Sequence, residues 1–350
     1  MVILTLIGLM MIYSTGLSSE GAGLFWLRQL FAAGGGLLGF FLLANIDYHF
    51  FRKNSTVFYL SAVAMLIFVL FFGLTIRGSS RWIDLGIFNF QPAEYAKLAV
   101  IIVLAKFFAK NSKLLQKFRY VLWSIGLVII PAALVVLQPD LGSGAILLAV
   151  WLGLLVVSPL PRRYFFYLLV IFLILALALW SFFLQDYQQN RIRSFLNPTA
   201  DPLGQGYNVI QSIVAVGSGG VFGRGLARGL QSQLQFLPER QTDFIFASTV
   251  EELGIFGGGL VLLLFFFVLW RLLRILKNAR DLFGMYLAAG VFSLILVQLT
   301  VNVGMNLGLL PVTGVTLPFL SFGGSSLVIM FWLAGIVESV ARHSVPVRFG

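Results

Sequence analysis

The chain contains no cysteine and few charged residues. Without cysteine, disulfide bonds and thiolate metal sites are excluded. Charged residues make up 11% of the 350 residues, whereas a soluble globular chain has about 25%, and hydrophobic residues reach 59%. This balance excludes an ordinary soluble domain and indicates a polytopic membrane protein.

Acidic residues are scarce as well, at 13 against 24 lysines and arginines. The basic residues lie mostly in one set of short connections between apolar segments, and the positive-inside rule places such connections in the cytoplasm. We therefore interpret the net charge of +11 as a signal of topology and expect no nucleic-acid binding. Both termini are predicted to be cytoplasmic. Most acids map to the outer side, so any chemistry is expected to face outward.

Apolar segments recur along the whole chain. A transmembrane helix needs about 20 apolar residues, and the segment that begins at Met1 is expected to stay as the first span. We expect an all-α polytopic membrane protein, a single integral-membrane domain over 1–350, with about ten transmembrane helices. The predicted spans are 1–17, 24–44, 55–76, 92–109, 120–138, 142–158, 164–184, 244–270, 282–304 and 323–341.

The connection between the seventh and eighth spans, 185–243, is far longer than the usual loop of at most about a dozen residues. Valine and isoleucine recur at near-helical spacing over 209–216, which predicts an amphipathic helix on the bilayer surface. Glycines then crowd together over 217–229 around Arg224 and Arg228, and glycine allows backbone N–H groups to converge on an anion. Composition alone leaves two alternatives open: a structured extracytoplasmic loop with a function, or a flexible surface loop.

Asp243 stands where this long loop turns into the apolar segment 244–270. An ionisable group at the rim of a membrane must be paired, hydrated or used. One alternative is structural, because Thr242 or Asp243 could cap the first turn of the following helix. The other is catalytic, although a positive helix end would stabilise the carboxylate and make it a weaker base.

Further polar residues also allow a structural or a functional interpretation. Glu94 and Lys97 are three residues apart, so they share a helix face and can neutralise each other. Arg81, next to Trp82, could line a cavity or anchor the chain at the membrane interface. Asp140 lies in a Gln-Pro-Asp turn, which it is expected to pin.

Glu251 and the neighbouring Glu252 lie about eight residues into the eighth predicted span. A charged residue at mid-span costs about 2.5–3.5 kcal/mol even on insertion scales, so both side chains must face protein or water. Glycines at 254 and 257–259 would allow another segment to approach closely. We expect polar packing to be the role of both glutamates.

Several motifs occur in a fixed order along the chain. They include QPAE at 91–94, QPDLG at 138–142, LPERQTDFIF at 237–246, NVGMNLGLLP at 302–311 and LPFLSFGGSS at 317–326. Together with 191–198, 201–207 and 217–220, they resemble the SEDS family of bacterial cell-wall glycosyltransferases, typified by RodA, FtsW and SpoVE. The resemblance covers essentially the whole chain.

The resemblance implies a peptidoglycan glycosyltransferase that polymerises lipid II on the outer face of the cytoplasmic membrane. Transfer would proceed with inversion, and undecaprenyl diphosphate would leave. By its position in the Thr-Asp-Phe-Ile-Phe motif, Asp243 would be the catalytic base, or it would hold a divalent cation, Mg²⁺ or Mn²⁺, against the diphosphate. The substrate would be bound by Arg191, Arg224, Arg81, Glu94 and Lys97, with support from Thr242, Glu239, Asp140 and Glu251.

The family also implies partners, namely a class B penicillin-binding protein with transpeptidase activity and other membrane proteins of the elongation complex. The sequence PVTGVTLP at 311–318 favours the RodA-like branch, which acts in cell elongation and rod shape, over a septal FtsW-like polymerase. A lipid II transporter and a non-catalytic scaffold for a transpeptidase remain alternatives from other classes.

Overall fold

Each of the ten apolar segments coincides with an α-helix in the computed structural model, which describes residues 1–18, 22–76, 79–84, 86, 89–182, 189, 195, 197 and 206–344. Six of these helices (α2, α3, α5, α11, α12 and α13) are long and apolar enough to cross a membrane, and α1 and α6 are shorter apolar helices. The ten helices are α1 (Val2–Gly16), α2 (Ala22–Asn45), α3 (His49–Phe72), α4 (Pro92–Asn111), α5 (Phe118–Leu137), α6 (Leu141–Val157), α7 (Arg162–Phe182), α11 (Ile245–Asn278), α12 (Leu282–Asn306) and α13 (Gly324–Ser344).

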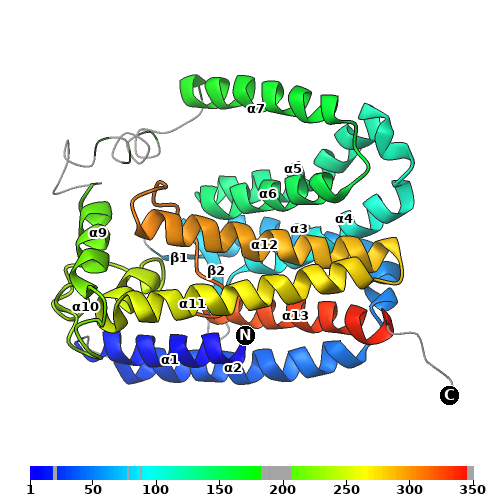
Figure 1. Ribbon diagram of the computed structural model, residues 1–350. Coiled ribbons are helices and arrows are strands. Elements are labelled where there is room, and N and C mark those ends of the chain that lie inside the picture. Colours follow the sequence, from blue (N-terminus) through cyan, green and yellow to red (C-terminus); the bar gives the residue numbers. More distant parts are fainter. Residues whose placement is uncertain are drawn as a thin grey trace, which may run out of the picture.

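The helices run alongside one another, and α12 occupies the middle of the bundle (Figure 1). Around it pack α4, α6, α11 and α13, while α7 runs along the edge. Close approach to α12 requires a small residue, because a β-carbon on Gly153 of α6 would lie 2.1 Å from the Ser293 hydroxyl. The centre of the bundle is therefore a tightly packed apolar core. Such a core can hold the polar groups attached to its helices at fixed positions.

A small sheet departs from the predicted all-α fold. The third apolar segment was predicted to continue to residue 76, but α3 ends at Phe72 and the chain turns into an extended strand after Gly73. The strands β1 (Leu74–Ile76), β2 (Ser79–Asp84) and β3 (Asn89–Phe90) pair antiparallel in the order β1-β2-β3, with Ile83 opposite Phe90. Threonine, isoleucine and tryptophan favour such strands. The sheet leads directly into the start of α4.

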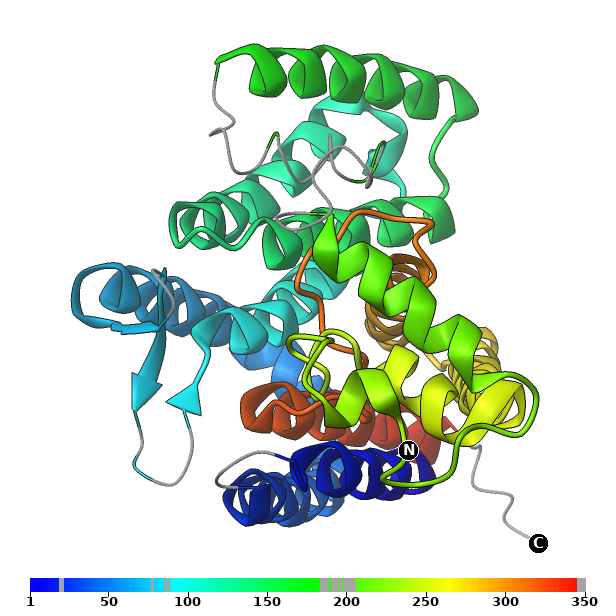
Figure 2. The same cartoon turned by 90° about the vertical axis from the view of Figure 1, so that its left-hand side faces the viewer.

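The long loop before α11 is structured where it is described. It contains α9 (Tyr207–Gly219) and the short α10 (Leu230–Gln233). A short 3₁₀ helix, η1 (Leu114–Gln116), lies outside this loop, between α4 and α5. Helix α9 lies crosswise to the bundle at the end where α11 begins, which we call the site end (Figures 1 and 2). Its buried face, with Val209, Ser212 and Ala215, packs against α11 and α12, and Ile213 and Val214 are exposed. Its location on a bilayer surface stays a prediction.

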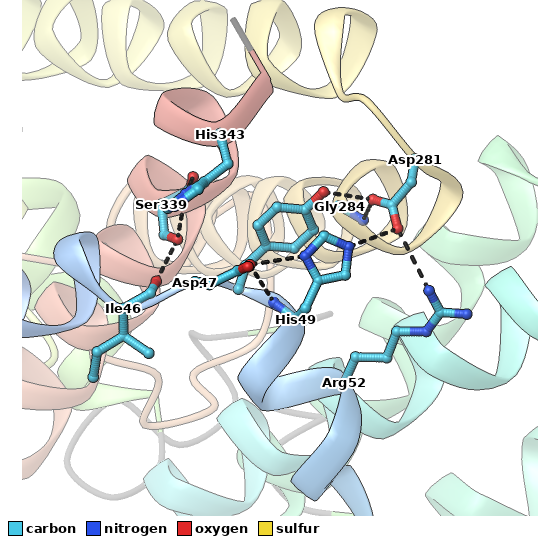
Figure 3. Close-up of polar contacts among 9 residues, drawn as sticks. Ile46, Asp47, His49, Arg52, Asp281, Gly284, Ser339 and His343 are labelled. Carbon is cyan, nitrogen blue, oxygen red and sulfur yellow. Dashed lines mark hydrogen bonds and ion pairs between the residues drawn. The ribbon is translucent and has the colours of Figure 1, made fainter.

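At the opposite end of the bundle, the α2–α3 turn is joined to the start of α12 (Figure 3). Asp281 caps α12 by accepting the Gly284 N–H over 2.9 Å, and the Tyr48 hydroxyl donates to the same oxygen. His49 and Arg52 approach its other oxygen, at 3.6 and 3.7 Å. The junction fixes three helices relative to one another at the end remote from Asp243.

Candidate functional site

Asp243 lies on a tight turn two residues before α11 and is half-buried. The N-cap position belongs to Phe244, which makes no side-chain cap, so neither Thr242 nor Asp243 occupies it. One free N–H group of the first turn, that of Ala247, donates to Oδ1 of Asn306 on α12 over 2.9 Å. The N-cap position that the sequence offered to Thr242 or Asp243 is therefore taken by a residue without a capping side chain.

Two asparagines of α12 hold the backbone of Asp243. The side-chain amides of Asn302 and Asn306 both donate to the Asp243 carbonyl, each over 3.0 Å, and both residues are 0% exposed. Asn302 also donates to the carbonyl of Val315 over 2.7 Å. One helix face therefore fixes the turn before α11 and the segment after α12 at the same point.

The carbonyl groups that precede Asp243 are held in the same way. Those of residues 240, 241 and 242 accept, respectively, from the Ser248 hydroxyl (3.3 Å), the Phe322 N–H (2.8 Å) and the Ser321 hydroxyl (2.7 Å). Four successive carbonyls are thus tied to α11, α12 and the segment before α13. A side chain whose backbone is held this firmly does not have to reorient before it reacts, so the activation barrier includes little cost of reorganisation.

The Asp243 carboxylate borders the segment that follows α12. A β-carbon on Gly314 would lie 3.6 Å from Oδ2 of Asp243. Gly314 is exposed and has a φ of +72°, a backbone conformation that favours glycine. Any larger residue there would be strained and would face the carboxylate.

A second polar cluster lies on the other side of this segment. Arg81 Nη1 is 3.5 Å from Oδ2 of Asp140, and the Gln91 amide donates to that oxygen over 3.2 Å. Oδ1 of Asp140 accepts from the Ser143 N–H, so Asp140 also caps α6. A β-carbon on Gly142 would lie 2.6 Å from the Thr313 carbonyl. The segment 313–315 therefore lies close both to the start of α6, which Asp140 caps, and to the Asp243 carboxylate.

Thr242 and Glu239 form part of the turn itself. The Thr242 hydroxyl lies within hydrogen-bonding distance of the Glu239 carboxylate (3.1 Å) and of its carbonyl (3.2 Å). The neighbouring Arg240 donates to the Thr15 carbonyl over 3.0 Å, which ties the turn to α1. Burial lowers the pKa of the Arg240 guanidinium, and the charge of Glu239 partly opposes that shift.

Glu94 and Lys97 form an ion pair inside the bundle. The Lys97 ammonium donates to Oε1 of Glu94 over 2.7 Å, and the two residues are 2% and 4% exposed. They occupy the first turns of α4, which begins with Pro92 in a position that tolerates proline. Their mutual neutralisation is as the spacing predicts.

Backbone N–H groups do converge on an anion next to the glycine-rich segment, but the donors belong to α10 and the anion is a glutamate of the protein. The carboxylate of Glu251, which is 0% exposed, accepts from the N–H groups of Gln231 (2.7 Å) and Ser232 (3.0 Å). Arg224 is exposed and donates to the Ser218 carbonyl over 3.2 Å. The prediction for Arg191 lies outside the described residues.

Sequence reasoning did not assign Asn302, Asn306 and Ser321 a role. The spacing of the asparagines contained a usable signal, because amides four residues apart in an apolar helix share one face and need partners there. The partner that they share is the Asp243 carbonyl, 59 and 63 residues away in sequence, and no local pattern predicts that pairing.

Within the part of the chain that the structure describes, no three His, Asp or Glu side chains are grouped to hold a metal ion. A cation at Asp243 would need further oxygen ligands, which a substrate can supply. Magnesium commonly binds in this way, through one or two carboxylates and phosphate oxygens.

Comparison with known proteins identifies the family. A family model for FtsW, RodA and SpoVE, described as cell cycle protein, matches residues 1–345. The chain belongs to the FtsW/RodA/SpoVE family. The SEDS resemblance of the sequence is thereby confirmed.

Two curated relatives of this FtsW/RodA/SpoVE member cover most of the chain. Stage V sporulation protein E of Bacillus subtilis (strain 168) is 41% identical, over 98% of this chain and 96% of its own length. Peptidoglycan glycosyltransferase MrdB of Escherichia coli (strain K12) is 39% identical, over 88% of this chain and 83% of its own.

A solved structure shares the fold of the whole chain. It comes from work on structural coordination of polymerization and crosslinking by a peptidoglycan synthase complex. That chain aligns with a TM-score of 0.82 and 32% identity, over 99% of this chain and 97% of its own. Relatives at this level of similarity are membrane proteins of the same family.

Proposed function

We propose that the protein is a peptidoglycan glycosyltransferase that polymerises lipid II, with Asp243 as the reacting carboxylate. The observation that carries the proposal is the fixation of Asp243, because Asn302, Asn306 and Ser321 hold the backbone around a carboxylate that remains half-buried. Relatives that cover most of this chain carry the name peptidoglycan glycosyltransferase. Fixed geometry at one carboxylate is what a general base requires.

The reaction needs a base and a positively charged leaving-group site. The Asp243 carboxylate would take the proton from the acceptor hydroxyl. The oxygen of that hydroxyl forms the new bond to the anomeric carbon of the lipid-linked donor. The bond from that carbon to undecaprenyl diphosphate breaks, and the diphosphate leaves with the electron pair. A positioned base supplies about 10²–10⁴-fold in rate. Guanidinium groups, with Arg224 and Arg81 as candidates, suit the diphosphate oxygens.

A divalent cation is the alternative role for Asp243. Mg²⁺ or Mn²⁺ held between this carboxylate and the diphosphate would neutralise charge on the leaving group. Loss of polymerisation on addition of EDTA, with recovery on addition of Mg²⁺ or Mn²⁺, would support this alternative over a base that acts alone.

The proposed location is the bacterial cytoplasmic membrane, with the site end outside the cell and both termini in the cytoplasm. Ten spans would give an even number of crossings, which suits termini on the same side. The distribution of lysine and arginine supports this orientation. A lipid II transporter would need the same spans, but the fixed Asp243 favours chemistry at one end.

Within the family we propose the elongation branch. The segment 311–318, with Thr313, supports it. Similar relatives carry the names RodA and FtsW as well as SpoVE and MrdB, so a septal, FtsW-like role is the alternative. Complementation of elongation-defective and division-defective cells would separate the two.

The proposed partner is a class B penicillin-binding protein that crosslinks the strands, together with other membrane proteins of the elongation complex. Support comes from the solved peptidoglycan synthase complex, a complex that coordinates polymerization and crosslinking, because one of its chains shares this fold. Co-purification with such a transpeptidase tests the proposal.

The polymerase proposal is tested with purified protein and lipid II. Wild-type protein should make glycan strands, and Asp243→Asn should reduce the rate by about 100-fold or more. The matched control is Asp84→Asn, the same change at an exposed carboxylate on β2, which should keep the wild-type rate. Wild-type activity in a folded Asp243→Asn protein would remove Asp243 from the mechanism, and inactive wild-type protein would remove the function.

A further inference from the structure

Helix α11 is interrupted at Gly254, and the glycine-rich loop forms hydrogen bonds with the backbone groups left open there. We call this set of backbone hydrogen bonds the splice. Gly254 has non-helical backbone angles, φ 71° and ψ −169°. In an unbroken helix the N–H groups of residues 255 and 256 would pair with the carbonyls of 251 and 252. Here the loop provides partners for all four groups: Arg224 N–H to the 251 carbonyl (3.0 Å), Gly225 N–H to 252 (2.9 Å), 255 N–H to the Gly220 carbonyl (3.0 Å) and 256 N–H to Val221 (3.5 Å).

The splice depends on glycine on both sides. A β-carbon on Gly223 would lie 2.2 Å from the Glu252 carbonyl, and one on Gly254 would lie 2.3 Å from the Val221 carbonyl. Both residues have positive φ, +79° and +71°. Contacts this short leave no room for a side chain, so glycine is required at these two positions, where backbone meets backbone.

The side chains of Glu251 and Glu252 hold the next part of the same loop. Glu251 accepts from the N–H groups of residues 231 and 232 and from the Ser232 hydroxyl. Glu252 accepts from the Ala227 N–H (3.2 Å), the Gln233 amide (3.4 Å) and the Ser14 hydroxyl of α1. Both glutamates are 0% exposed, and all these donors are uncharged. Two adjacent residues thus clamp 220–233 with main chain and side chain.

The clamp acts directly on the loop's two arginines. The Arg224 N–H is one of the splice hydrogen bonds, and Arg228 follows Ala227, whose N–H binds Glu252. Both arginines are exposed. Their backbones are therefore fixed to α11, which begins two residues after Asp243, while their guanidinium groups remain accessible to a ligand.

We propose that Glu251 and Glu252 are positioning residues that set Arg224 and Arg228 for the diphosphate of the lipid-linked substrate. The inference rests on the proposed polymerase function. It also differs from a use of the loop backbone as a phosphate cradle, because the N–H groups of Ala227, Gln231 and Ser232 are already bound to the two glutamates. The substrate's negative charge is then met by side chains of the loop and not by its backbone.

Kinetics provide the first test. Glu251→Gln and Glu252→Gln should raise KM for lipid II by about tenfold, with a smaller change in kcat, because the arginines would lose their set position. In an Arg224→Ala/Arg228→Ala background the same glutamine substitutions should cause little further loss. Losses that multiply in that background, or a fall in kcat with KM unchanged, would overturn the proposal.

Distance measurements provide the second test and do not depend on activity. Because the natural chain has no cysteine, spin labels can be placed on Leu226→Cys in the loop and Leu260→Cys on α11, which are 46% and 48% exposed. The label-to-label distance distribution should be narrow in the parent and broad after Glu251→Gln/Glu252→Gln. Gly223→Ala should broaden it without touching either carboxylate.

The control for both tests is Glu338→Gln, which changes a half-buried glutamate paired with Arg271 on the far part of α11. It should leave KM and the distances unchanged. An unbroadened distribution in the double glutamine variant would overturn the clamp. If the parent protein makes no glycan but its label-to-label distances respond as expected, the proposed polymerase function is rejected and the clamp is supported. The proposed role of the arginines in diphosphate binding is then rejected together with the polymerase function.

Discussion

The position of Asp243 depends on side chains that carry no charge. Asn302 and Asn306 satisfy its carbonyl, and Asn306 also accepts the Ala247 N–H that starts α11. A side-chain amide can do both because it presents a donor and an acceptor on one group. A charged residue at 306 would provide only one of them and would require burial of its charge.

Asn306→Leu should therefore reduce both polymerisation and stability. The substitution leaves the buried Ala247 N–H without a partner, which costs about 1–3 kcal/mol, and leaves the Asn302 amide as the remaining side-chain donor to the Asp243 carbonyl. Displacement of the turn by about 1 Å should lower the rate by about 100-fold. Glycan synthesis and thermal unfolding in detergent measure the two effects.

The matched control for this substitution is Asn54→Leu on α3, a half-buried asparagine whose amide donates to the Phe50 carbonyl of its own helix in a solvent-exposed hydrogen bond. It should change neither quantity substantially. A wild-type rate in Asn306→Leu protein would show that the hydrogen bonds to the Asp243 carbonyl are dispensable for catalysis.

At the scale of helices, the apolar segments predicted where α1–α7 and α11–α13 lie, because burial in lipid or protein demands long apolar runs. Their ends were harder to predict. The eighth segment was predicted to end at residue 270, but α11 continues to Asn278 through Arg271 and Arg274. Backbone hydrogen bonds do not depend on hydropathy, and Arg274 lies 3.7 Å from the centre of the Trp270 ring.

The splice at Gly254 could not be predicted from local sequence. The glycines at 254 and 257–259 indicated close approach of another segment, and those over 217–229 indicated N–H groups gathered around an anion, but neither pattern shows which segments meet. The two segments pair across about 30 residues of sequence. The role of each segment becomes clear only when the position of the other in the fold is known. Likewise, the sequence indicated Glu251 as buried and polar, whereas its donors come from α10 and the residues around it.

Substitutions in the Glu94–Lys97 ion pair on α4 can distinguish a structural role of the two residues from a role in substrate binding. Lys97→Met should strongly destabilise the protein, by about 3–5 kcal/mol, because the buried Glu94 charge is left uncompensated. Glu94→Gln/Lys97→Met should recover most of that stability. If the pair is structural, polymerisation should recover with stability in the double variant.

Unfolding and polymerisation are measured side by side for these α4 variants. A double variant that is as stable as wild type but inactive would place the pair on the substrate, as the family resemblance implies. Lys106→Met, on the same helix and half-buried, serves as the control.

At the scale of the whole molecule, the two ends of the bundle are built differently. The site end gathers the sheet, α9, α10 and the turn that carries Asp243, whereas the opposite end has short connections and the Asp281 junction (Figures 1 and 3). Polar chemistry is concentrated where the chain leaves the regular helices. A polymerase that works on a lipid-linked substrate needs this asymmetry, since its sugars must stay on one side of the membrane while the lipid remains in it.

This asymmetry predicts that the two ends face different compartments. Single cysteines can be placed in the cysteine-free chain at Leu234, 58% exposed beside α10, and at Leu114, 37% exposed on η1 between α4 and α5. In intact cells, a membrane-impermeant maleimide should label Leu234→Cys at once. Leu114→Cys should react only after the membrane is permeabilised, because the basic residues around it hold that connection in the cytoplasm. Labelling of Leu114→Cys in intact cells, with Leu234→Cys protected, would invert the topology and put Asp243 on the side where no strand could be added to the wall.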